Sequence, residues 1–220
     1  HLSIRRQRQM CIRDSSPPGR LQQALAGLSQ DAASVEAQSR PFLDDQAADP
    51  AQGSGRARLL NCIAFALFRL DELPALRRQV RDRSVPVEDA DSRFTQVIGS
   101  LLAVVFEAAD LALDPGVTRI LVALLNFMQG KESSGQERTC GVTGFTAGCF
   151  TDTQKARMLG LAANQRRSFD TYAHYAEGAA LQCWAELQQQ DPPLQRMRDM
   201  AQRTDSAQPV DSTLAELWFN

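Results

Sequence analysis

Apolar residues recur along this chain mainly at steps of three and four positions, which is the spacing of one face of an α-helix. Clusters of Pro, Gly, Asp and Ser interrupt the pattern and mark the expected helix ends. No stretch alternates as a half-buried strand does, so the predicted fold class is all-α, a helical bundle. The predicted helices span about 20–40, 57–70, 73–84, 85–112, 114–150, 153–175, 179–190 and 194–204, with another starting at 211.

Two helices carry further local predictions. Thr151 and Asp152 precede the helix over 153–175 and are expected to cap its N-terminus, because such side chains accept hydrogen bonds from free backbone N–H groups. In the segment 85–112 the pattern is expected to turn these side chains inward: Phe94, Val97, Ile98, Leu101, Leu102, Val105 and Phe106.

The stretch from Asp114 to Phe150 is predicted to be the central helix, against which the others pack. Its apolar stripe, followed at about 100° per residue, is interrupted by polar residues before it becomes apolar again. The positions along this stripe are Val117, Leu121, Leu124, Leu125, Met128, Lys131, Glu132, Gly135, Arg138, Val142 and Phe145. Lysine and arginine on a core-directed face cost several kcal/mol unless counter-charges or a bound anion compensate.

The spacing of the polar positions indicates an anion site. Lys131, Gly135 and Arg138 lie at i, i+4 and i+7, so they share a side, and the glycine leaves space between the two cations. A small planar anion suits this site, because the planar fork of arginine matches a trigonal oxyanion. The alternative is an ion-pair ladder along the helix, with Glu132 or Ser134 against Arg138 and Lys131 reaching water.

A close family resemblance rests on the stretch NFMQGKESSGQERTCGVTGFTAGCF, together with FTQVIGSLLAVVFEAADLALDPGVTRILVALL just before it. These residues resemble the nitrate- and nitrite-sensing domain of bacterial nitrate-responsive transcription antiterminators. The resemblance runs from about Leu59 through RRSFDTYAHYA to STLAELWF, roughly three quarters of the chain. The Gly-Lys-Glu and Gly-Gln-Glu-Arg signature of the family is matched by Gly130, Lys131, Glu132, Gly135, Gln136, Glu137 and Arg138.

The resemblance implies two packed four-helix bundles that share long helices, with nitrate or nitrite held between helices by arginines. Arg138 is the one family arginine that can be placed in this sequence. The resemblance also implies a homodimer, and a C-terminal RNA-binding domain that prevents transcription termination and is missing here. The expected ligand-binding residues are Arg138, Gly135, Lys131, Gln136 and Glu137.

The expected domain organisation has three parts. Residues 1–19 form a basic, disordered and non-native leader, 20–210 form the sensing domain, and 211–220 begin a truncated helix that leads to the missing effector domain. The bundle is thus expected to be incomplete at both ends. The family motif Glu-Arg-Gly of the first helix is not found, and no residue is assigned in its place. The alternative function is therefore a structural or interaction bundle that no longer binds ligand.

Composition restricts the classes of protein that remain. An apolar content of 43% with only 6% aromatic residues suits a helical globular protein. The net charge of −2 gives no global reason to bind nucleic acid or an anionic membrane. No uninterrupted apolar run reaches the roughly 18 residues of a spanning helix, so the protein is expected to be soluble and cytoplasmic, with no membrane partner.

Candidate chemistry outside the anion site is sparse. The spacing of the five cysteines and two histidines matches no metal-binding motif, so no bound metal is expected. The sequence also contains no catalytic arrangement and no cofactor motif, so we expect neither a cofactor nor enzymatic activity. Cys140 is either a reactive thiol or a small core residue, and His174 is expected to pack rather than catalyse. Arg166 and Arg167 are rival anion ligands, although the segment 165–168 is expected on a solvated face.

Overall fold

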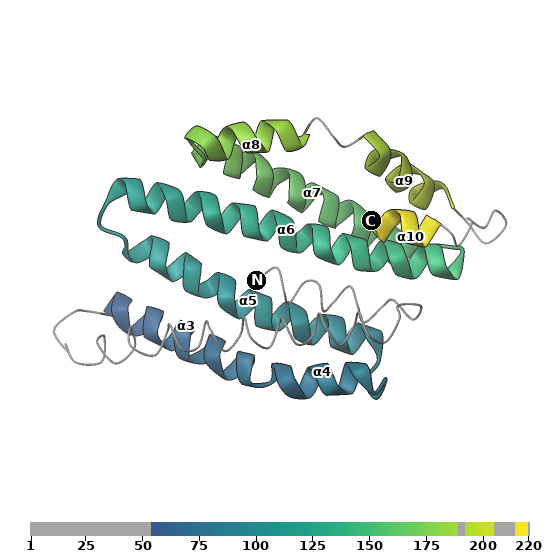
Figure 1. Ribbon diagram of the computed structural model, residues 1–220, viewed down its shortest axis with the longest axis horizontal. Helices are drawn as coiled ribbons and strands as arrows, with labels where there is room; N and C mark the ends of the chain where they lie inside the picture. The colour runs from purple at the N-terminus through teal and green to yellow at the C-terminus, as the bar shows by residue number, and fades with distance from the viewer. Residues whose placement is uncertain (1–53, 189–191, 205–213, 220) are drawn as a thin grey trace. The chain divides into compact units, whose positions relative to one another are not determined.

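The computed structural model describes residues 54–188, 192–204 and 214–219 (Figure 1). Every regular element in these ranges is an α-helix, which confirms the predicted all-α fold class. The predicted leader 1–19 and the predicted helix 20–40 lie outside the described residues. The helices are α3 (Ser54–Asp71), α4 (Leu73–Arg81), α5 (Val87–Leu111), α6 (Pro115–Ala147), α7 (Asp152–Tyr175), α8 (Gly178–Gln188), α9 (Pro192–Arg203) and α10 (Leu214–Phe219).

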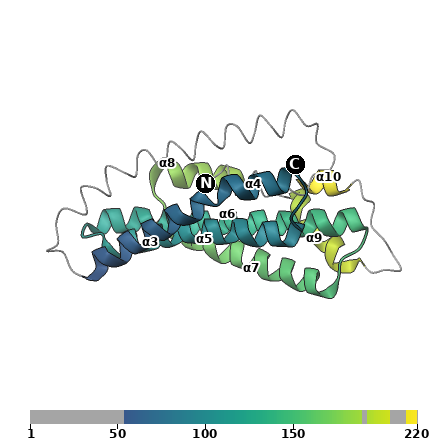
Figure 2. The same cartoon turned by 90° about the horizontal axis from the view of Figure 1, so that it is seen from below.

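The chain divides into two compact units, His1–Leu121 and Val122–Asn220, and the boundary falls within α6. In the first unit α3 and then α4 follow the length of α5 (Figures 1 and 2). Two exposed ion pairs from Arg58 to Glu107 and Asp110, at 3.2 and 2.7 Å, join α3 to α5. The core of this unit comes from α4 and α5 and consists of Leu73, Leu76, Ala90, Phe94, Val97 and Ile98.

The inward face predicted for α5 is wrong at Phe106, which is 58% exposed. Twelve residues at about 100° each place Phe106 roughly 120° around the helix from the buried Phe94. The apolar stripe of α5 is therefore wider than the face that its neighbours cover.

By length and composition alone, α5 is also long and apolar enough to cross a membrane, with a mean hydropathy of 1.5 over its best window. A count of uninterrupted apolar runs does not detect α5, because polar and charged residues interrupt its apolar stretch. A mostly buried core helix of a soluble protein passes the same test, whereas 28% of this window is buried. Phe94, Val97 and Ile98 of α5 belong to the buried cluster of the first unit.

Local signals set the ends of the two longest helices of the second half. Asp114 Oδ1 accepts the N–H of Val117 at 3.0 Å where α6 begins. The helix ends at Ala147, before Gly148 with φ of 75°, a left-handed conformation that glycine adopts without strain. The predicted Thr151 cap of α7 is confirmed: its Oγ1 accepts from Gln154 N at 3.2 Å, and Gln154 Oε1 accepts from Thr151 N at 2.9 Å.

In the second unit, aromatic rings lie directly against glycines of α6. Phe145 is fully buried, and its ring centroid lies 5.0 Å from that of Phe150 and 5.6 Å from that of Trp218. A Cβ added at any of three glycines would approach a ring atom closer than real Cβ contacts allow: 2.5 Å at Gly130 (Phe169), 2.1 Å at Gly141 (Trp218) and 2.2 Å at Gly144 (Phe150). These glycines therefore allow α7, α10 and the segment after α6 to approach its backbone.

Candidate functional site

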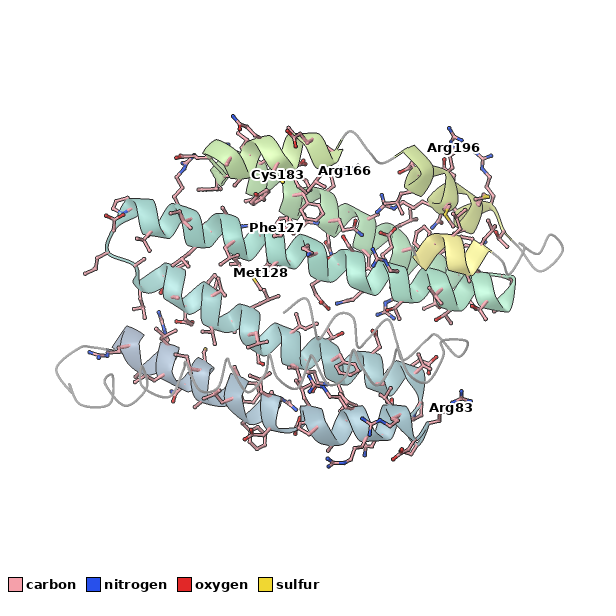
Figure 3. All side chains as sticks on the ribbon, viewed as in Figure 1. Arg83, Phe127, Met128, Arg166, Cys183 and Arg196 are labelled. Atoms are coloured by element: carbon pink, nitrogen blue, oxygen red, sulfur yellow. The ribbon has the colours of Figure 1, made fainter. Side chains whose placement is uncertain are left out.

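A hollow of about 870 Å³ lies in the second unit, and each of the five helices described there contributes to its walls. Figure 3 shows the side chains of these helices and labels Arg166 of α7, one of the wall residues. The described lining residues are Ser134, Glu137 and Arg138 of α6, Ala162, Gln165, Arg166, Phe169 and Asp170 of α7, Trp184, Leu187 and Gln188 of α8, Leu194, Met197 and Arg198 of α9, and Leu217 and Trp218 of α10.

Arg138 presents a half-buried guanidinium at this hollow. Burial lowers the pKa of Arg138 from its ordinary value, and the negative charge of Glu137 opposes that shift. Within the described ranges the Arg138 side chain has no hydrogen bond or ion pair. Desolvation of this cation is therefore not offset by a direct counter-ion from the residues that the structure describes.

Glu137, the neighbour of Arg138, is only 3% exposed and is held by two other helices. Arg198 of α9 donates to both carboxylate oxygens, from Nε at 2.6 Å and from Nη2 at 2.7 Å. Gln165 of α7 donates a short hydrogen bond to Glu137 Oε2 and accepts one from Arg198 Nη2 at 3.0 Å. The Glu137 charge is thus balanced by Arg198, in the paired geometry that buried carboxylates require.

The other predicted site residues lie outside the set that lines the hollow. Lys131 Nζ lies 5.6 Å from the ring centroid of Phe127, at cation–π distance. Gln136 Nε2 donates to Glu132 Oε1 at 2.9 Å. The carbonyl oxygen of the buried Gly135 accepts a hydrogen bond from Thr139 Oγ1 at 3.1 Å. The structure thus brings Arg138 and Glu137 to the hollow, and leaves Lys131, Gly135 and Gln136 on other contacts.

The ion-pair ladder that we considered as an alternative is not formed by Arg138. Ser134 Oγ donates to the carbonyl of Gly130 at 3.0 Å, and Glu132 accepts from Gln136. In the part of the chain that the structure describes, neither residue pairs with the Arg138 guanidinium.

The predicted solvated face of α7 is wrong at Gln165, which is 7% exposed. Its amide satisfies Glu137 and Arg198 at once, so a polar residue is buried there without an unpaired group. Arg166 and Arg167 are both exposed, as expected. They nevertheless differ, because Arg166 lines the hollow, whereas Arg167 lies outside the lining set and donates to Asn164 Oδ1 at 3.3 Å.

A second, smaller hollow of about 290 Å³ lies beside α7 and α9. Four of its lining residues are charged, namely Glu137, Arg166, Arg198 and Asp199. Three of these, Glu137, Arg166 and Arg198, also line the larger hollow, so the ion pair between Glu137 and Arg198 forms a shared wall.

Cys140 and His174 both pack against neighbouring groups. Cys140 is 5% exposed, and its Sγ lies 3.7 Å from the carbonyl oxygen of Gln154, as expected of a small core residue. The His174 ring packs edge-on against Tyr175 with centroids 5.2 Å apart. No group of three potential metal ligands occurs among the described residues.

Sequence reasoning missed Arg198, Trp184 and Trp218 as parts of the site. Arg198 is 61 positions from Glu137 and stands in no local pattern with it. Trp218 Nε1 donates to the main-chain oxygen of Arg138 at 3.1 Å, a contact between residues 80 positions apart. No spacing rule along one helix connects such residues.

Comparisons with known proteins identify the family of this chain. Residues 14–220 match the family described as nitrate and nitrite sensing, or NIT. A nitrate regulatory protein from Klebsiella oxytoca is 35% identical over 155 residues, which cover 70% of this chain and 39% of that protein. The solved structure of the NasR transcription antiterminator matches with a TM-score of 0.84 and 28% identity, over 99% of this chain and 58% of that one. This chain therefore spans less than two thirds of the length of either relative. The resemblance read from the signature residues is confirmed, and the chain belongs to the NIT family of nitrate- and nitrite-sensing domains.

Proposed function

We propose that this chain is a ligand-sensing regulatory domain that binds nitrate or nitrite in the larger hollow, at Arg138. One observation carries the proposal: a half-buried guanidinium with no direct counter-ion in the described ranges lines a hollow in the second unit. A small planar oxyanion would provide the missing charge and accept two parallel N–H donors from the arginine fork.

The charges around the hollow favour an anion there. Glu137 and Arg198 balance each other, which leaves Arg138 and Arg166 against the single carboxylate of Asp170. A site with an excess of cationic groups and partly apolar walls attracts anions more strongly than open solvent does.

The same proposal extends to the larger protein. Residues 20–210 form the sensing domain, and 211–220 lead toward an RNA-binding antitermination domain whose activity the bound anion controls. Such a regulator acts as a cytoplasmic homodimer and catalyses no reaction. Support comes from the names of the two relatives, a nitrate regulatory protein and a transcription antiterminator, both longer than this chain.

Isothermal titration calorimetry of the 220-residue chain with nitrate, nitrite and chloride at constant ionic strength tests the binding step. We expect binding of nitrate or nitrite without comparable binding of chloride. Arg138→Lys should weaken binding by about tenfold or more, because lysine keeps the charge but loses the planar fork. Arg167→Lys, the same change at an exposed arginine outside the hollow, is the matched control.

Equal binding by the Arg138→Lys and Arg167→Lys variants would refute the assignment of the anion to Arg138. A wild-type chain that binds neither oxyanion would refute the sensing proposal for this chain. That result would favour the alternative of a helical structural domain that no longer binds ligand.

A further inference from the structure

Arg166 holds an unusual position among the exposed arginines of α7. It lines both the larger and the smaller hollow, whereas its neighbour Arg167 lines neither. Figure 3 labels it on α7, and Phe169 of the same helix packs against Trp184 of α8 with ring centroids 4.6 Å apart. The family signature that contains Arg138 does not include Arg166. The sequence pattern favours a solvated face for the segment around Arg166.

The ionic contacts of the site leave the Arg166 guanidinium available. Asp170 is one turn along α7 and Asp199 lies across the smaller hollow, yet neither forms an ion pair with Arg166 in the described ranges. Asp199 Oδ1 instead accepts from Gln195 at 3.0 Å. Glu137 is already bound by Arg198.

We infer that Arg166 is a further guanidinium of the anion site, so that the ligand held by Arg138 of α6 is also contacted by Arg166 of α7. This inference rests on the proposed function. Arg166 lines the larger hollow together with Arg138, and the positive charge of these two arginines exceeds the negative charge of Asp170 there. Arginine suits the role because its long, flexible stem allows an exposed helix residue to bring a planar fork to the ligand. The bound oxyanion would then connect two helices, and its binding would depend on how α6 and α7 are placed.

The test compares Arg166→Gln, Arg166→Lys, Arg167→Gln and Arg138→Lys by calorimetry with nitrate, and checks the thermal midpoint of each variant without nitrate. Hydrogen bonds to charged groups predict that Arg166→Gln weakens nitrate binding roughly ten- to a hundredfold. Arg167→Gln should leave the affinity within about twofold, because it changes the same net charge outside the hollow. The nitrate-free midpoints should match, since both side chains are exposed.

Arg166→Lys distinguishes contact from a general field effect. A direct contact by the arginine fork predicts weaker nitrate binding and a lower preference for nitrate over chloride, whereas full affinity in this variant would overturn the contact. Equal affinity of Arg166→Gln and Arg167→Gln, with binding still lost in Arg138→Lys, would overturn the inference and leave the proposed function intact. Unchanged binding in Arg138→Lys would overturn both.

Discussion

Replacing Gly141 with alanine tests whether α10 packs on α6 next to Arg138. The new Cβ would lie 2.1 Å from Trp218 Nε1 and 2.3 Å from Cε2, so the indole must move by more than an ångström. Trp218 is 6% exposed and donates to the Arg138 main-chain oxygen at 3.1 Å. The substitution therefore removes a hydrogen bond and part of an aromatic contact while it leaves every other side chain unchanged.

The expected cost follows from three terms. Loss of the indole hydrogen bond costs about 1 kcal/mol, and partial exposure of the ring costs about 2 kcal/mol at roughly 25 cal/mol per Å². Alanine in place of glycine within a helix raises the unfolding free energy by about 1 kcal/mol. We therefore expect the second unit to lose about 2 kcal/mol of unfolding free energy. Gly160→Ala in α7 is the matched control, because its Cβ would meet nothing within 4 Å, and it should gain about 1 kcal/mol.

Denaturant unfolding followed by tryptophan emission measures both effects. The chain has two tryptophans, so a Trp184→Phe background isolates the signal of Trp218. Gly141→Ala should shift the folded-state emission to the red and lower the unfolding midpoint, whereas Gly160→Ala should do neither. If the two alanine variants gave the same emission and the same gain in stability, the packing of Trp218 on Gly141 would be disproved.

Two other substitutions test an ion pair and a helix cap of the second unit. Arg198→Met leaves the buried Glu137 without its cation and should cost about 3–5 kcal/mol, and the double variant with Glu137→Gln should recover most of that loss in thermal unfolding. A single variant as stable as the wild type would contradict the buried ion pair. Thr151→Ala removes the capping box of α7 and should cost about 1 kcal/mol, whereas Thr153→Ala, in the exposed first turn, should change stability by less than about 0.5 kcal/mol. Similar midpoints for the two threonine variants would argue against the cap.

The starts of α6 and α7 were predictable because the groups that determine them are neighbours in sequence. The end of α6 was not: the predicted helix runs to Phe150, whereas α6 ends at Ala147, before Gly148 with its positive φ. Thr151 and Gln154 satisfy each other across one turn, and Asp114 caps a helix that starts with proline. The all-α class followed from the same local periodicity. The width of the buried face did not, because the exposure of Phe106 depends on which neighbours cover α5.

Of the five predicted ligand-binding residues, Glu137 and Arg138 line the larger hollow and the other three do not. Position along the helix correctly put Lys131 and Arg138 on one side, yet helical side chains lean toward the N-terminus. Lys131 accordingly reaches Phe127, one turn back and away from Arg138. The partners of Glu137 come from α7 and α9, and only the tertiary fold brings these helices to α6.

Glycines of α6 that meet rings from other segments restrict how sequences of this family can diverge. A methyl group at Gly130, Gly141 or Gly144 requires its ring partner to shift or shrink. Each position is therefore expected to covary in size with its ring partner, so that a larger side chain at 141 appears beside a smaller one at 218. Homologous sequences would then preserve the summed volume of each pair rather than the identity of either residue. The positions at which α7 and α10 contact α6 could then be inferred from sequence variation alone.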